Sequence, residues 1–173
     1  MKITRFLSVI AIGMFALLTS SCNKEPVPIV ITGTWNIDTS KTVLIVKFDE
    51  LKANEYPAAL NFLEKNIQKI RKSLPQPEQI IFSETNSVTF KFEEGMFIEG
   101  TYTQIDKMYF KINISIFPDG IVCGSDNRNL EIYYNRDHIL GALTNILTPN
   151  DPPYSVFEEL IIDQSVGTSF YSR

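Results

Sequence analysis

Apolar and polar residues alternate along much of the second half of the chain, and this period of two predicts β-strands with one buried face. The clearest run extends from Met108 to Ile116, where Met, Phe or Ile occupies every second position and Tyr, Lys, Asn and Ser lie between them. Polar or glycine-containing segments separate the runs, Pro118-Asp119-Gly120 among them, which is typical of an antiparallel meander. Further strands are predicted at 43–48, 80–82, 88–92, 96–103, 130–134, 157–162 and 168–171.

The period changes between residues 55 and 73. Apolar residues there are spaced 4, 3, 4, 3 and 4 apart from Tyr56 to Leu74, which places them on one stripe of an α-helix. Asn54 can cap this helix after a polar turn at 49–54, and the prolines that follow Leu74 end it. The stripe predicts a helix that covers the sheet, and its length of under three heptads disfavours half of a coiled coil. A shorter helix is predicted over 138–147.

The first 22 residues have the order of a secretory signal: a positive start, an apolar stretch and small residues. Lys2 and Arg5 precede the apolar stretch Phe6–Leu18, which is shorter than the ~20 residues that span a bilayer as a helix. Small polar residues then lead to Cys22, and the segment resembles a bacterial lipoprotein signal, in which this cysteine is acylated. An ordinary cleaved signal peptide and a short membrane-anchoring helix remain as alternatives.

This resemblance implies a division of the chain into three parts. Residues 1–21 are expected to be a signal peptide, 22–30 the lipidated Cys22 and a proline-containing tether, and 31–173 a single domain. The implied location is the cell envelope, with the outer membrane expected and the leaflet left open. Membrane contact would be made through the lipid anchor.

Charge and cysteine content narrow the classes of partner. Removal of residues 1–21 takes away Lys2 and Arg5 and no acid, which leaves 14 of the 16 basic residues, all 20 acidic ones and a net charge of −6. Such a balance argues against a nucleic-acid partner, which needs clustered Lys and Arg. If Cys22 carries lipid, Cys123 has no disulfide partner and is expected to be a free, half-buried thiol.

Residue types that carry catalysis are scarce. His138 is the only histidine and is expected to be a surface residue at a helix start, while the acid pairs Glu93-Glu94 and Glu158-Glu159 are adjacent, so on a strand their side chains would diverge. Asp119, Asp126 and Asn127 are expected to lie in a solvated loop rather than to hold calcium. We therefore predict no catalytic residue, no metal and no cofactor, and we do not expect an enzyme.

The domain resembles the lipocalin-like lipoproteins of Bacteroidota. The resemblance rests on Gly33-Thr34-Trp35 at the start of the domain, the amphipathic helix, Gly100-Thr101-Tyr102-Thr103 and the long run 108–116. It implies a mainly β (α+β) fold, an antiparallel barrel or strongly curved sheet with one or two helices. Gly33 and Trp35 would close one barrel end, with Arg136 or Arg173 over the indole. A helix between the first strands departs from the usual lipocalin order.

Two functions remain open at this stage. In the first, the barrel binds a small apolar ligand; in the second, it is solid and binds another envelope or surface protein as an anchored adaptor. The interior volume would separate these functions, because the same side chains can either line a ligand or fill the core. Candidate lining residues are Phe90, Phe92, Tyr102, Phe110 and Ile112.

Overall fold

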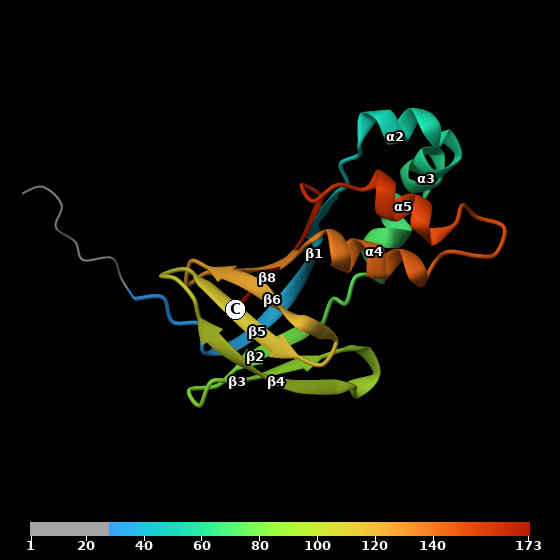
Figure 1. Ribbon diagram of the computed structural model, residues 1–173. Coiled ribbons are helices and arrows are strands. Elements are labelled where there is room, and N and C mark those ends of the chain that lie inside the picture. Colours follow the sequence, from blue (N-terminus) through green and yellow to red (C-terminus); the bar gives the residue numbers. More distant parts are fainter. Residues whose placement is uncertain (1–27) are drawn as a thin grey trace, which may run out of the picture.

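Residues 28–173 are described by a computed structural model, and they contain a closed antiparallel barrel of eight strands (Figure 1). Each strand pairs with the next along the chain, and the last pairs with the first. This confirms the predicted mainly β fold. Of the two predicted forms, an antiparallel barrel and a strongly curved sheet, the structure is the barrel. The strands are β1 Gly33–Ile45, β2 Gln79–Phe82, β3 Ser87–Lys91, β4 Phe97–Gln104, β5 Tyr109–Ile114, β6 Phe117–Ser125, β7 Asn129–Tyr134 and β8 Val166–Ser172.

The helices gather beyond one end of the barrel (Figure 1). They belong to the two long connections, from β1 to β2 and from β7 to β8, which both leave the barrel at this end. We call this end the mouth and the opposite one the closed end. Of the described residues, no helix is both long enough and apolar enough to cross a membrane. The helices are α2 Glu50–Glu55, α3 Pro57–Ser73, α4 Arg136–Thr144 and α5 Tyr154–Leu160, with a 3₁₀ turn, η1, at Glu93–Gly95.

The predicted helix over 55–73 corresponds to α3, Pro57–Ser73, and a separate short helix, α2, Glu50–Glu55, precedes it. α2 begins early because the Asp49 carboxylate accepts hydrogen bonds from the backbone of Leu51 and Lys52, so the predicted turn at 49–54 and the Asn54 cap are wrong. α3 starts again at Pro57, whose missing N–H is tolerated in a first helical turn. Its apolar stripe then behaves as predicted, because Leu63, Ile70 and the following Leu74 are buried.

Two other segments differ from the prediction. Residues 157–160 of the segment predicted as a strand at 157–162 lie in helix α5, whose buried Phe157 and Leu160 share one helical face, and Ile161 forms only an isolated antiparallel bridge with Phe48. The run 108–116 is β5 only to Ile114, because the chain reverses at residues 115–116, where Ile114 pairs with Phe117. Pro118-Asp119-Gly120 is therefore a bulge within β6 and not the turn.

Strand β1 is longer than its apolar run and is less buried at its end. Residues 33–36 pair with β2 and residues 36–45 pair with β8, with a bulge between Asp38 and Val43. Val43 and Ile45 face outward and are about half exposed, at 44% and 50%, so the apolar run 43–48 is not a buried strand throughout. The predicted helix at 138–147 is α4, which ends at Thr144.

Candidate functional site

The closed end of the barrel is built around Trp35. Its side chain is fully buried, its Nε1 donates to the Ile31 carbonyl at 2.7 Å, and the Arg173 guanidinium carbon lies 4.5 Å from the ring centroid. Arg173 also donates to the carbonyls of Val30 and Thr32. Of the two arginines considered for this place, Arg173 occupies it, and Arg136 lies among the helices. Gly33 opens β1 with a φ of 120°, a conformation that side chains with a Cβ rarely adopt.

Most of the predicted ligand-lining residues are packed into the barrel core. Tyr102 contacts Phe110 with ring centroids 6.2 Å apart, and Phe90 contacts Phe117 at 6.5 Å. Ile112 and Phe90 are fully buried, and the Tyr102 hydroxyl donates to the Ser83 carbonyl. These four candidates therefore pack against one another and against neighbouring side chains. Phe92 differs, because it is half-buried at the mouth.

A cleft of about 810 Å³ opens at the mouth, beside the helical layer. Three segments form it: the bulged middle of β1, the C-terminal end of α3 with the chain that leads into β2, and the η1 turn between β3 and β4. The three segments are separated from one another in the sequence. The lining residues are Ile37, Thr39, Thr42, Arg71, Lys72, Leu74, Pro75, Gln76, Glu78, Phe92, Glu93, Glu94 and Met96.

The cleft combines an apolar surface with charges of both signs. Arg71 is fixed by the bulge, since its Nη1 donates to the Thr42 carbonyl at 3.1 Å, while Gln76 donates to the Arg71 carbonyl. Within residues 28–173, the Nε and Nη2 atoms of Arg71 make no hydrogen bond, and the charged lining residues form no ion pair. The Nε and Nη2 groups of the Arg71 guanidinium are thus available to donate to an acceptor in the cleft.

Hydroxyl groups on β1 and β8 are buried, and one of them, that of Thr42, belongs to a residue that lines the cleft. Thr42, Ser169 and Tyr171 are nearly or fully buried, and their hydroxyls have no hydrogen-bond partner in the described part of the chain. The Tyr134 hydroxyl donates to the Pro75 carbonyl at 2.7 Å, and burial raises the pKa of Tyr134 and of Tyr171. The buried core is therefore not purely apolar.

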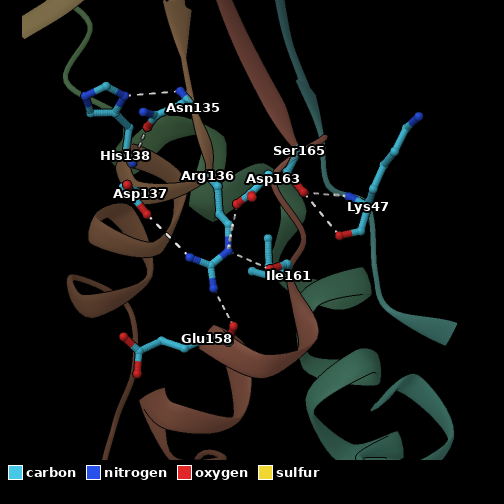
Figure 2. Close-up of polar contacts among 9 residues, drawn as sticks. All are labelled: Lys47, Asn135, Arg136, Asp137, His138, Glu158, Ile161, Asp163 and Ser165. Carbon is cyan, nitrogen blue, oxygen red and sulfur yellow. Dashed lines mark hydrogen bonds and ion pairs between the residues drawn. The ribbon is translucent and has the colours of Figure 1, made fainter. Parts of the chain in front are cut away.

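Arg136 joins the helices at the mouth (Figure 2). It donates to the carbonyls of Glu158 and Ile161, the latter at 2.7 Å, and these carbonyls lie at the C-terminal end of α5. Nearby, Ser165 accepts from the Lys47 backbone N–H and donates to the Lys47 carbonyl, which ties β8 to the chain after β1 (Figure 2). The hydrogen bonds to the carbonyls of Glu158 and Ile161 connect the start of α4 to the end of α5, and the exposed carboxylates of Asp137 and Asp163 lie 3.4 Å and 3.8 Å from the Arg136 guanidinium.

His138 is more buried than the sequence indicates. It lies in the first turn of α4, where its Nδ1 accepts from the Asn135 N–H and the Asn135 side chain accepts from the His138 N–H (Figure 2). Its ring packs edge-on against Phe117, with centroids 5.0 Å apart, and against Tyr134. Burial lowers the pKa of His138, and the nearby Asp137 and Asp119 oppose this shift. His138 therefore lies at a helix start as predicted, but it is half-buried rather than fully on the surface.

Cys123 is fully buried rather than half-buried. It faces the barrel interior from β6, between Phe110 on β5 and Ile132 on β7. Burial raises the pKa of its thiol to about 12. The nucleophilic thiolate is therefore strongly disfavoured in the folded protein.

The acidic residues singled out in the sequence do not converge. Asp126 accepts from the backbone N–H groups of Arg128 and Asn129 in a tight turn, and Asn127 holds the chain near residue 28. Asp119 lies in the β6 bulge. Residues 28–173 contain no group of three His, Cys, Asp or Glu side chains placed to hold a metal ion.

Sequence reasoning missed most of the cleft. Of its lining residues only Phe92 is among the candidates, because the strand alternation identifies inward positions but not the place where β1 bulges. The one local signal is the cationic end of α3, Arg71-Lys72, followed by Pro75-Gln76-Pro77. Cys22 lies outside the described residues. Comparisons of this chain with models of known protein families, with curated proteins and with solved structures gave no match.

Proposed function

We propose that this protein is an exported, lipid-anchored binding protein of the cell envelope with a lipocalin-like domain, and that it binds a small amphipathic molecule at the barrel mouth. The observation that carries the proposal is the cleft of about 810 Å³, a volume typical of small-molecule sites. Anchoring at Cys22 and export, with the outer membrane as the expected site, rest on the order of residues in the first 22 positions.

The lining suggests what the ligand carries. Ile37, Leu74 and Phe92 offer an apolar surface, while Arg71 offers two guanidinium nitrogens without a protein acceptor in the described chain. An acidic group on the ligand would accept from this fork, because planar bidentate binding of carboxylate or phosphate is the usual role of arginine. The glutamates of the cleft are exposed, so water and salt screen their repulsion of such a group.

Native mass spectrometry of the 23–173 fragment purified from its host tests this function. A small molecule that co-purifies with the fragment, and is lost from Arg71→Gln, supports ligand binding in the cleft. Lys65→Gln is the matched control, because it removes a positive charge from the same helix at an exposed position outside the cleft. Retention of the same molecule by both variants would exclude Arg71 from the site.

The second candidate, an anchored adaptor, is favoured by one observation. The inward side chains of the barrel fill it, and Trp35, Phe82, Phe90, Tyr134 and Tyr171 are among the largest fully buried residues. A solid barrel leaves its surface for contacts, and Met96 and Phe97 are exposed beside the mouth. In the same experiment, a reproducible protein partner without a small molecule would favour the adaptor.

The anchor has a separate test. Cys22→Ser removes the acylation site and is expected to release the protein from membranes into the soluble fraction. Cys123→Ser is the control, because it removes the only other cysteine and is expected to leave membrane retention unchanged. Unchanged retention of the Cys22→Ser variant would overturn the lipoprotein assignment.

A further inference from the structure

The N-terminal end of the described chain is fastened to the closed end of the barrel. The Val30 N–H donates to the Asn127 side-chain oxygen at 2.6 Å, and the Asn127 amide donates to the Pro28 carbonyl at 3.2 Å. Arg173 adds hydrogen bonds to the carbonyls of Val30 and Thr32. These contacts come from the β6–β7 connection and the C-terminus, so they fix the point at which the tether leaves the domain.

This exit point lies opposite the cleft. Figure 1 shows the blue N-terminal segment at the far side of the barrel from α2 and α3, while the cleft is lined by the end of α3. Strand β4 has eight residues, and at ~3.3 Å per residue and a tilt of ~40° it spans about 20 Å of barrel height. A layer of helices adds about 10 Å. The outer surface of the helices is therefore about 30 Å from the exit point.

The tether is shorter than this distance. From Cys22 to Pro28 there are six Cα–Cα steps, and a fully extended chain covers at most ~3.6 Å per residue, or about 20 Å in all. We propose that the anchored protein turns its closed end toward the membrane, so that the outer surface of the helical layer cannot rest on the bilayer. This inference rests on the anchoring at Cys22 proposed above.

Energy transfer to the membrane surface tests the orientation. The full-length lipidated chain is reconstituted in phosphatidylcholine vesicles that contain a headgroup-labelled acceptor lipid. A donor dye is attached to one new cysteine, either Glu84→Cys in the β2–β3 turn at the closed end or Glu64→Cys on α3. The two substitutions are matched, since each replaces an exposed glutamate. Cys123 is buried and does not compete for the dye.

Energy transfer from position 84 is expected to exceed that from position 64 at least about twofold, because position 84 lies at the closed end and position 64 in the helical layer beyond the mouth. A flexible insertion of about 15 residues between Asn23 and Lys24 is expected to reduce this ratio toward one, because it more than doubles the reach. Equal or stronger transfer from position 64, in protein that floats with the vesicles, would overturn the orientation alone. Failure of the native chain to float with vesicles would overturn the anchoring, and the inference with it.

Discussion

Replacement of Arg136 by Ala is expected to loosen the helices at the mouth without unfolding the barrel. The side chain is 24% exposed and donates to the carbonyls of Glu158 and Ile161. Hydrogen bonds from a charged donor contribute ~1.5–3 kcal/mol each when both groups are buried. Here the carbonyls regain some water after the change, and a positive charge leaves the unfavourable N-terminal turn of α4. The expected net loss is about 2 kcal/mol of unfolding free energy.

Thermal and urea unfolding measure this loss. For a domain of this size about 2 kcal/mol lowers Tm by about 4–8 °C. The carboxylates of Asp137 and Asp163, which lie 3.4 Å and 3.8 Å from Arg136, are mostly exposed, so their ion pairs contribute little. The loss should therefore persist in ~0.5 M salt, where exposed ion pairs are screened.

The control for this prediction is Arg128→Ala. Arg128 is exposed, and in the described chain only its backbone N–H donates a hydrogen bond. Its replacement is expected to cost under ~0.5 kcal/mol. Equal losses for the two variants, or a loss at Arg136 that disappears in high salt, would refute the assignment to carbonyl capping.

Other measurements follow from single contacts. Cys123 should not react with a thiol reagent at pH 8 in the folded protein and should react fully in denaturant, since burial raises its pKa to about 12; rapid native reaction would contradict this. Arg173→Gln should change the emission of Trp35, the only tryptophan, and cost about 1–2 kcal/mol, and an unchanged spectrum would argue against the stacked geometry. Burial lowers the pKa of His138 below 6.5, so the unfolded chain binds this proton more readily and stability falls as pH drops from 7.5 to 5.5. His138→Gln should reduce this slope in urea unfolding, and an unchanged slope would assign it to other groups.

Strand and helix periods were sufficient for much of the fold, because each reports which side of an element is buried. Val88 and Phe90 alternate with polar neighbours and are both fully buried in β3, and Leu63 and Ile70 occupy one face of α3 as predicted. These segments have two unlike faces. A pattern that distinguishes faces identifies the element, even when its ends are displaced by a few residues.

For short apolar segments, the local sequence did not distinguish a strand from a helix. Phe157, Leu160 and Ile161 are all buried, and their positions suit either a strand or one turn of helix. In the folded chain Arg136 caps the final carbonyls of α5 from more than 20 residues away in sequence. A contact at that separation leaves no local signal.

The position of the cleft follows from the size of the side chains that the barrel contains. An eight-stranded barrel is only just wide enough for its interior to be filled by side chains, and Trp35, Phe90 and Tyr134 are fully buried within it. The cleft instead lies where the packing changes, at the mouth, where β1 bulges and α3 ends. The bulge brings the Thr42 carbonyl to Arg71. We therefore expect the ligand preference to depend more on this junction than on the aromatic residues of the core.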